Sequence, residues 1–324
     1  MSKTKLNSAV VTGATGFIGA HLCRSLIADG VATYGFDLVH HARSEPCDIF
    51  IGDIRRPDHL ESFFDRNTAQ VVFHLAARAE VVVPLDELPT LFATNINATV
   101  NVLRAAPVQK VIFASSSAVY GTARKVVTAL WDDVHPLGSY GLSKAAAEMA
   151  CQEWARSTGG VALSFRFGNV IGAGCRGLIP YLVLHAIRFP NGSVKAQMRG
   201  HGNLIRDYVP VQHVVDLMKK AAAMEWPPAT SRAFNIGTGR GTTNGEIAAI
   251  VSRVLSEYGY ALQIDFDNPA MPGESEEIVL DVASTPETFG LSIPGEQEIT
   301  DAIKQAILHC LRVFTAEGAL PGRS

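Results

Sequence analysis

Short apolar runs alternate with amphipathic segments along the first half of the chain. Runs typical of strands cover residues 9–13, 32–37, 49–53, 70–77 and 110–116, and segments with helical spacing of apolar residues cover 17–30, 59–65 and 93–106. The runs VVFHL and VIFAS are apolar without alternation, as expected of strands buried on both faces. The pattern predicts βαβ units and hence an α/β fold, a doubly wound parallel sheet covered by helices on both faces.

The rhythm continues after residue 140 and then loosens. A helix is predicted from Tyr140 to about Arg156, a strand at 161–169, a helix near 211–225 and a strand at 233–237. The stretch between Val170 and Tyr208 is richer in Gly and Pro. We therefore predict a first α/β domain at 1–168 with a return segment at about 210–238. A smaller, discontinuous α/β lid is expected at 169–209 and 239–324.

Composition narrows the classes of partner. The 324 residues include 28 basic and 31 acidic side chains, a net charge of −3, and no basic stripe suited to nucleic acid or an anionic membrane. The chain begins without an apolar signal segment and has no apolar run of about 18 residues, so we expect a cytoplasmic protein without a membrane anchor. Five cysteines without CxxC spacing favour buried thiols over a disulfide framework or a metal site.

A glycine-rich turn lies between the first predicted strand and helix. Gly13, Gly16 and Gly19 permit a tight turn and a close approach of the backbone to a pyrophosphate at the helix N-terminus. Asp37 ends the second strand, where a carboxylate can accept hydrogen bonds from ribose hydroxyls and would repel a 2′-phosphate, which favours NAD over NADP. Asp53 closes the third strand and can either touch the adenine or start the following helix.

Tyr140 and Lys144 lie four residues apart on one predicted helix. They share a helical face, so the lysine ammonium, together with a nicotinamide cation, can lower the pKa of the phenol until it serves as a base. The spacing also occurs in ordinary amphipathic helices, and the serines that end the run at 110–116 can simply bond the backbone. The serine run precedes the tyrosine by about 20 residues in a chain with a dinucleotide loop, which favours a catalytic pair.

Together the motifs GATGFIG, GDIRRPD, HLAA, SSSAVYG, YGLSK, RFGNVIGAG and RDYVPVQHVVD resemble the extended short-chain dehydrogenase/reductase family. The resemblance is to its nucleotide-sugar epimerase and dehydratase branch, the UDP-glucose 4-epimerase type, and spans residues 9 to about 290. It implies that residues 1–168, with the return segment at about 210–238, form a Rossmann-type NAD-binding domain and that the lid at 169–209 and 239–324 binds substrate. It also implies NAD as cofactor, a nucleotide sugar as substrate, and a homodimer formed through helices that include the one with Tyr140. No metal is implied.

The resemblance also implies roles for single residues. Tyr140 would be the base, Lys144 its partner that binds the nicotinamide ribose, and Ser116 the hydroxyl that bonds the reacting sugar hydroxyl. The substrate-binding residues implied are Ser116, Ser117, Asn169 and Arg206. The cofactor-binding residues implied are Gly13, Gly16, Phe17, Ile18, Gly19, Asp37, Asp53, Ile54, Leu75, Ala76, Ala77, Asn95, Tyr140 and Lys144. Local helix capping is the alternative for Asn95.

The residue types at the positions of Ser117 and Ala118 distinguish the reactions that members of this family catalyse. The dehydratases resembled here carry an Asp-Glu pair at these positions, and decarboxylases carry a Glu at the second, whereas neither residue of this chain can transfer a carboxylate's proton. We therefore expect NAD-dependent epimerisation at C4 of a UDP-linked sugar through a transient 4-keto intermediate. The alternatives are a dehydratase, decarboxylase or reductase on the same fold.

Two departures from the family pattern leave a further alternative, an NAD-binding sensor or scaffold without turnover. Met271 replaces an arginine that contacts phosphate in the family, and His213 replaces an aspartate. Retention of Tyr140 and Lys144 argues against a binding module, which has no need of an activated phenol. The loss at Met271 weakens the resemblance to a UDP pocket unless Arg206 or another arginine compensates.

Overall fold

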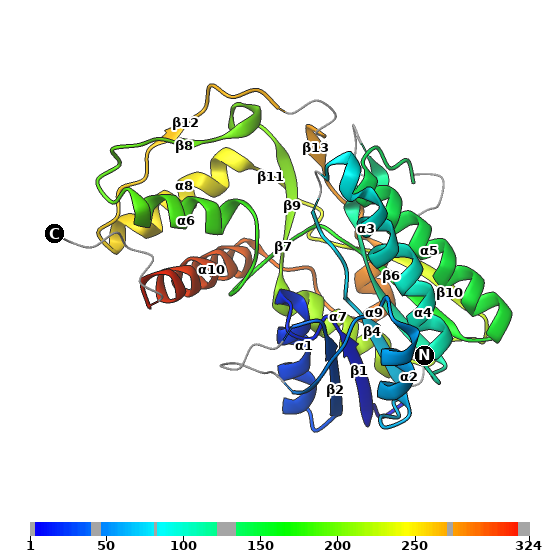
Figure 1. Cartoon of the computed structure of the whole chain (residues 1–324). Helices are drawn as coiled ribbons and strands as arrows, with labels where there is room; N and C mark the ends of the chain where they lie inside the picture. Colours follow the sequence, from blue (N-terminus) through cyan, green and yellow to red (C-terminus); the bar gives the residue numbers. More distant parts are fainter. Residues whose placement is uncertain (1–3, 40–46, 81–82, 122–133, 271–274, 317–324) are drawn as a thin grey trace.

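A seven-stranded parallel sheet forms the centre of the computed structural model, which describes residues 4–39, 47–80, 83–121, 134–270 and 275–316 (Figure 1). Its strands are β1 (Ser8–Thr12), β2 (Ala32–Asp37), β3 (Asp48–Ile51), β4 (Val71–His74), β5 (Lys110–Ser116), β6 (Val161–Phe167) and β10 (Ser231–Ile236). They are ordered β10-β6-β5-β4-β1-β2-β3, with the direction of winding reversing between β1 and β4. This order confirms the predicted Rossmann-type α/β fold and places a ligand crevice at the carboxyl ends of these strands.

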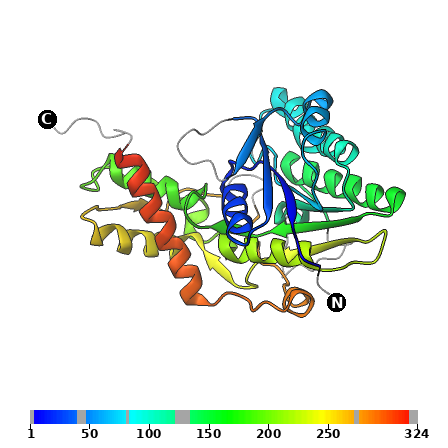
Figure 2. The same ribbon diagram turned by 90° about the horizontal axis from the view of Figure 1, so that it is seen from below.

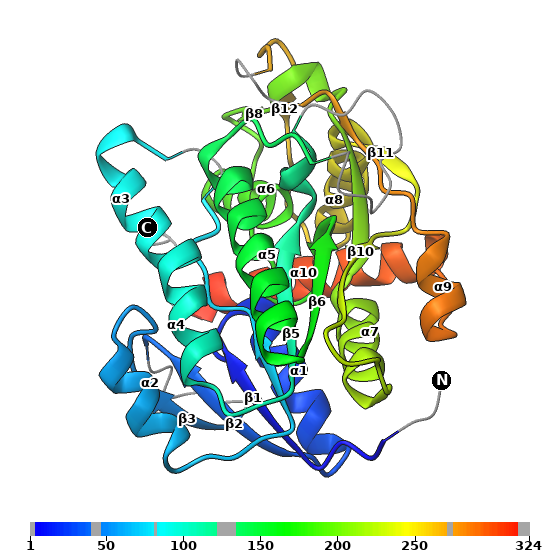
Figure 3. The same cartoon turned by 90° about the vertical axis from the view of Figure 1, so that its right-hand side faces the viewer.

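Helices cover both faces of the sheet. Helices α1 (Phe17–Ala28), α7 (Val211–Ala223) and α9 (Ser284–Phe289) pack on one face, and α2 (Pro57–Phe64), α4 (Ala98–Ala105) and α5 (Ser139–Thr158) on the other. Figure 2 shows α1 and α7 against the sheet, and Figure 3 shows α4 and α5 side by side on the opposite face. Strands β1, β4, β5 and β6 are therefore buried from both sides, which explains the apolar runs VVFHL and VIFAS that contain β4 and most of β5.

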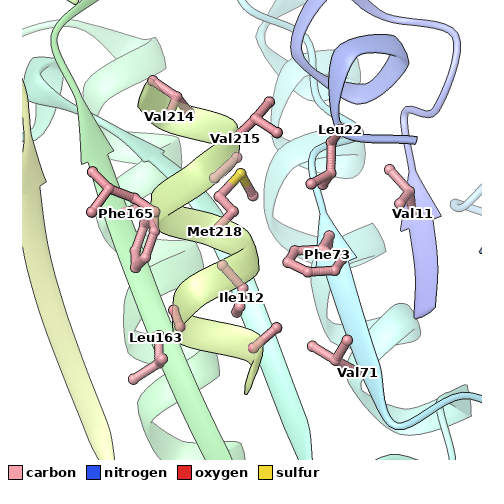
Figure 4. Close-up of a cluster of buried hydrophobic side chains, with 14 of the residues drawn as sticks. Val11, Leu22, Val71, Phe73, Ile112, Leu163, Phe165, Val214, Val215 and Met218 are labelled. Atoms are coloured by element: carbon pink, nitrogen blue, oxygen red, sulfur yellow. The ribbon is translucent and has the colours of Figure 1, made fainter. Parts of the chain in front are cut away.

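The side chains between α1, α7 and the sheet form a core that excludes solvent. Leu22 of α1 and Met218 of α7 meet Phe73, Ile112 and Phe165 of the strands, and all five side chains have no solvent exposure (Figure 4). Burial of each such side chain stabilises the fold by about 1.5–3 kcal/mol relative to exposure. Phe289 of α9 joins the same core, although residue 289 falls within the range predicted for the lid.

A second, smaller group of elements lies beside the carboxyl ends of the strands (Figure 1). Its strands β7 (Asn169–Ile171), β9 (Ile205–Pro210), β11 (Gly241–Thr243) and β13 (Glu277–Ile278) form one sheet, and β8 (Ala196–Gln197) pairs with β12 (Ile264–Asp265). Helices α6 (Leu178–Arg188), α8 (Asn244–Glu257) and α10 (Glu296–Ala316) pack around Leu182, Val251 and Ile303. This core is separate from that of the large sheet, and the chain returns to the large sheet through α7 and β10.

Short helical turns complete the described chain. They are η1 (Leu85–Glu87), α3 (Leu88–Phe92), the π-helical turn η2 (Ala93–Asn97), η3 (Ser117–Tyr120) and η5 (Arg199–Gly202). The segment expected to be helical at 93–106 thus begins with a π-helical turn before α4. Within the described residues no helix is both long and apolar enough to cross a membrane, and no His, Cys, Asp and Glu side chains gather as a metal site.

Candidate active site

The glycine turn joins β1 to α1 with little room for side chains. Gly13 has a φ of +71°, and a Cβ on Gly19 would lie 2.0 Å from the carbonyl oxygen of Gly13. Gly16 is the N-cap of α1 and leaves the first-turn N–H groups without a side-chain cap or an acidic neighbour. These donors and the positive end of the helix dipole suit a pyrophosphate group, so the turn fits the dinucleotide that the sequence predicted.

Asp37 is held against this turn at the end of β2. Its Oδ2 accepts hydrogen bonds from the backbone N–H of Thr15 at 2.9 Å and from the Thr15 hydroxyl at 2.7 Å. The carboxylate therefore lies beside the glycine turn, as a ribose-binding acid must. Asp53, by contrast, pairs with Arg55 at 2.6 Å, and this arginine lowers the pKa of the Asp53 carboxyl. Ile54 beside it is buried.

The segment after β4 packs against the glycine turn. Leu75 and Ala76 donate their N–H groups to the backbone oxygen and the hydroxyl of Thr12, and a Cβ on Gly13 would meet the nitrogen of Ala76 at 2.8 Å. Leu75, Ala76 and Ala77 are partly exposed there. Phe17 packs against both hydrophobic cores, while Ile18 packs against that of the large sheet.

Asn95 is buried in the π-helical turn and forms hydrogen bonds with the segment that follows Ala77. Its Oδ1 accepts from the N–H of Arg78 at 2.8 Å, and its Nδ2 donates to the Arg78 carbonyl and to Ser143 Oγ, each at 2.9 Å. The side chain bonds a neighbouring loop and α5, which differs from the local capping considered as an alternative. Asn95 therefore fixes that segment relative to the helix that carries Tyr140 and Lys144.

Ser116, Tyr140 and Lys144 come together at the carboxyl end of β5. The Ser116 side chain lies close enough to the Tyr140 phenol to lower its pKa, and the Lys144 Nζ lies 6.0 Å from the centre of the Tyr140 ring. Lys144 is buried, with its ammonium donating to the Ala114 carbonyl at 2.8 Å and lying 4.9 Å from the centre of the Phe113 ring. Two residues predicted from helical spacing thus share a face that points at the strand end.

Burial is the main cause of the pKa shifts of Tyr140 and Lys144 in this trio. Desolvation raises the pKa of Tyr140, opposed by the Ser116 side chain, and lowers the pKa of Lys144 to about 8. From the sequence, Lys144 and a nicotinamide cation together are expected to lower the pKa of the phenol; among the protein's own groups, burial has the largest effect and raises it. A phenol of raised pKa needs a further positive charge close to it before it can act as a base at neutral pH.

Gly141 permits the contact between α5 and the strand end. A Cβ on this residue would lie 2.3 Å from the backbone oxygen of Ala118, so only glycine lets the first turn of α5 approach η3. Ser117 is buried in η3, and Ser116 Oγ accepts from the Ala118 N–H at 3.2 Å. The chain contributes no carboxylate at 117 or 118, the two positions next to Ser116.

An open pocket in the second group of elements is lined by Asn169, Arg176, Tyr208 and the first turn of α6. Asn169 lies beside the Tyr208 phenol, which donates to Asn244 Oδ1 at 3.1 Å. Burial raises the pKa of Tyr208 to about 12, so this phenol stays protonated. The pocket combines amide and guanidinium donors with a helix N-terminus, a set that suits an anionic ligand.

Arg206 lies two residues before Tyr208 on β9. Its Nη1 donates to the carbonyl oxygen of Ile205 at 2.8 Å and to that of Glu276 at 3.4 Å, and the residue is not part of the pocket lining. Arg176 does line it, and the sequence analysis did not select that residue because a single arginine in a loop has no pattern. Met271 lies outside the described residues. His213 is half-buried on α7 near Asp216 and Glu298.

A doubly wound sheet, a glycine turn and a Ser-Tyr-Lys trio at the end of β5 define a dinucleotide-dependent enzyme of the short-chain dehydrogenase/reductase type. The sequence profile of the NAD dependent epimerase/dehydratase family matches residues 9–237, and the chain belongs to this family. Its cofactor is NAD, as the family is NAD-dependent and its structural neighbours bind NAD. The glycine turn and Asp37 are the residues of this chain that fit it.

Proteins named UDP-glucose 4-epimerase are similar along most of the chain. The UDP-glucose 4-epimerase of Rhizobium meliloti (strain 1021) is 26% identical over 297 residues, which cover 84% of this chain and 90% of the relative. The Thermotoga maritima UDP-glucose 4-epimerase with UDP-glucose superposes with a TM-score of 0.81 at 27% identity, covering 95% and 99% of the two chains. The Thermus thermophilus UDP-glucose 4-epimerase with NAD superposes with a TM-score of 0.79 at 27% identity. The match covers 94% of this chain and 99% of the other.

Proposed function

We propose that the protein epimerises a UDP-linked sugar at C4 through a transient 4-keto intermediate. The observation that carries this proposal is the close approach of Ser116, Tyr140 and Lys144 at the end of β5, without a carboxylate at 117 or 118. A hydroxyl and a phenol can move one proton to and from a sugar hydroxyl, whereas elimination of water needs a further acid and base. The UDP-glucose 4-epimerases to which the chain is similar support the same reaction.

Each residue of the trio has its own role in the proposed reaction. Ser116 holds the sugar 4-hydroxyl and passes its proton to Tyr140, which returns a proton when the opposite face of the sugar is reduced. NAD, when bound, supplies the acceptor and donor of the hydride and a positive charge that favours the Tyr140 phenolate. In this proposal Lys144 contributes its own charge nearby and binds a ribose hydroxyl.

The open pocket would hold the nucleotide diphosphate. Asn169 and Arg176 supply donors to phosphate oxygens, and the first turn of α6 adds backbone N–H groups. In this proposal Arg176 provides the guanidinium that the family carries at the position of Met271. A UDP sugar held at its phosphates can release and turn its sugar ring while the nucleotide stays bound, as inversion at one carbon requires.

Incubation of the purified full chain with UDP-glucose, UDP-N-acetylglucosamine and UDP-glucuronate, followed by NMR of the products, tests the proposal. We expect a C4-inverted sugar from at least one substrate and no net consumption of added NAD. Tyr140→Phe should abolish the product, while Tyr258→Phe, an exposed tyrosine at the end of α8, should not change it.

Other products would identify the alternative reactions. A stable 4-keto sugar would indicate a dehydratase, loss of carbon dioxide from UDP-glucuronate a decarboxylase, and net oxidation of NADH a reductase. Tight NAD binding without any conversion of a broad nucleotide-sugar panel would indicate a sensor or scaffold.

A further inference from the structure

A buried ion pair lies directly behind the catalytic trio. Glu148 of α5 and Arg166 of β6 are 5% and 1% exposed, and their two-pronged contact joins Arg166 Nε to Oε1 at 3.0 Å and Nη2 to Oε2 at 2.7 Å. The Glu148 carboxylate also accepts a hydrogen bond from Ser115, the residue next to Ser116. Glu148 follows Lys144 by one helical turn and Tyr140 by two, so one carboxylate ties the catalytic helix to the catalytic strand end.

The pair continues into a polar chain that reaches the C-terminal part of the fold. Arg166 Nη1 donates to the Tyr120 hydroxyl at 3.0 Å, and this hydroxyl donates to Asn235 Oδ1 in β10. Asn235 Nδ2 donates to the Asp281 carbonyl at 3.0 Å, and the Asn235 carbonyl accepts from Thr285 at 2.8 Å. Among the described residues no buried side-chain nitrogen or oxygen lacks a hydrogen-bond partner. Every polar side chain in this hydrogen-bond network therefore has a partner.

The energetics make a purely stabilising role a poor explanation. A buried ion pair often stabilises a fold no better than apolar side chains of the same size, because the cost of removing two charges from water offsets their attraction. Its directional bonds, however, fix three elements relative to one another. Tyr120, which bonds Arg166, is itself held in a buried cluster with Val119, Ala145, Leu280 and Val282.

We propose that Glu148, held by Arg166, is a positioning residue for the reaction. Through Ser115 and the backbone of α5 it fixes the distance between Ser116 and Tyr140 and keeps Lys144 in register with both. It does not touch the reacting atoms. The proposal rests on the proposed function only for its turnover measurement.

Lys144 offers a readout that does not depend on turnover. The titratable and charged groups around its ammonium are Tyr140, Glu148 and Cys151 on its own helix and His74 on β4, with Arg166 and Tyr120 beyond Glu148. Of these, Cys151 and Glu148 raise the pKa of Lys144, opposing the desolvation that brings it to about 8. Removing the carboxylate should therefore lower the pKa of Lys144 further.

Three variants of the full chain with NAD bound test the proposal. Ser115→Ala removes one hydrogen bond and leaves both charges. The double variant Glu148→Leu with Arg166→Met replaces the pair by apolar side chains and avoids an unpaired buried charge. Glu153→Gln is the matched control, because Glu153 lies on the same helix and pairs with Arg156 in solvent.

Two measurements separate positioning from folding. We expect kcat to fall about tenfold in Ser115→Ala and about a hundredfold in the double variant, with KM changed less than about twofold, as expected for sub-ångström misplacement. In a ¹³C NMR titration of labelled lysine, assigned with Lys144→Ala, the pKa of Lys144 should be lower in the double variant than in the wild type and stay unchanged in Glu153→Gln.

A folded double variant with wild-type kcat, or with the Lys144 titration unmoved, would overturn the proposal. If the wild-type protein converts no nucleotide sugar, the proposed function fails while the lysine titration still decides the role of Glu148.

Discussion

Acidification should destabilise the protein through one buried histidine. His74 ends β4, is 1% exposed, and bonds the hydroxyl of Thr12 through Nδ1 at 2.7 Å and that of Thr99 through Nε2 at 3.0 Å. Thr99 donates its proton to the Asn95 carbonyl, so it accepts from Nε2–H, and Nδ1 then accepts from Thr12. The hydrogen-bond pattern thus assigns a neutral imidazole with no place for a second proton.

The size of the stability loss follows from the pKa of His74 in the unfolded chain and in the native protein. Burial, aided by the positive charge of Lys144, lowers the pKa of His74 from 6.5 to about 3. Between these values the unfolded chain binds a proton that the native protein does not, so stability is present above pH 6.5 and is lost as the pH falls towards 3. At pH 5, about 1.5 units below the unfolded value, the loss is about 2 kcal/mol, since each unit corresponds to about 1.4 kcal/mol.

Urea unfolding at pH 7.5 and pH 5.0 measures this loss. Other groups also titrate in this interval, so the comparison is with His74→Gln, which cannot gain a proton, and with His135→Gln, an exposed histidine that serves as control. We expect the decrease in unfolding free energy on acidification to be about 2 kcal/mol smaller in His74→Gln than in the wild type or the control. Equal decreases in all three proteins would refute the reasoning.

Three further predictions concern the trio, the pocket and the surface. Gly141→Ala should lower kcat at least about tenfold because its Cβ forces α5 away from Ala118, whereas Gln152→Ala, exposed on the same helix, should leave turnover unchanged in the same steady-state assay. Arg176→Ala should raise KM for the nucleotide sugar about tenfold without an effect on NAD affinity, and Arg188→Ala at the other end of α6 should change neither. The homodimer expected from the family would bury the side chain of Met149, 56% exposed on α5, so Met149→Glu should shift the sedimentation coefficient from dimer to monomer; a wild-type monomer would contradict this expectation.

The parts of the site that depend on local spacing could be predicted from the sequence. The three glycines require only a tight turn and a helix start, and Tyr140 and Lys144 require only one helical face. The parallel sheet could be predicted from the apolar runs, because a strand buried on both faces has few other places in a fold. The motif resemblance added NAD, which the family membership supports.

The parts that depend on long-range packing could not be predicted. Glu148 and Arg166 meet only because α5 lies across β5 and β6, and neither residue is unusual in its own segment. Arg176 is a lone cation in a loop until α6 and β9 enclose a pocket around it. The raised pKa of Tyr140 likewise depends on how deeply the folded chain buries the phenol, which spacing does not reveal.

An isotope experiment tests the central proposal most directly. A UDP sugar deuterated at C4 is incubated with the full chain in ordinary water, and the product is analysed by NMR and mass spectrometry. Hydride removal and return within one site predicts a C4-inverted product that retains its deuterium at C4. Loss of that deuterium to the solvent, or no C4-inverted product from any UDP sugar, would contradict the account.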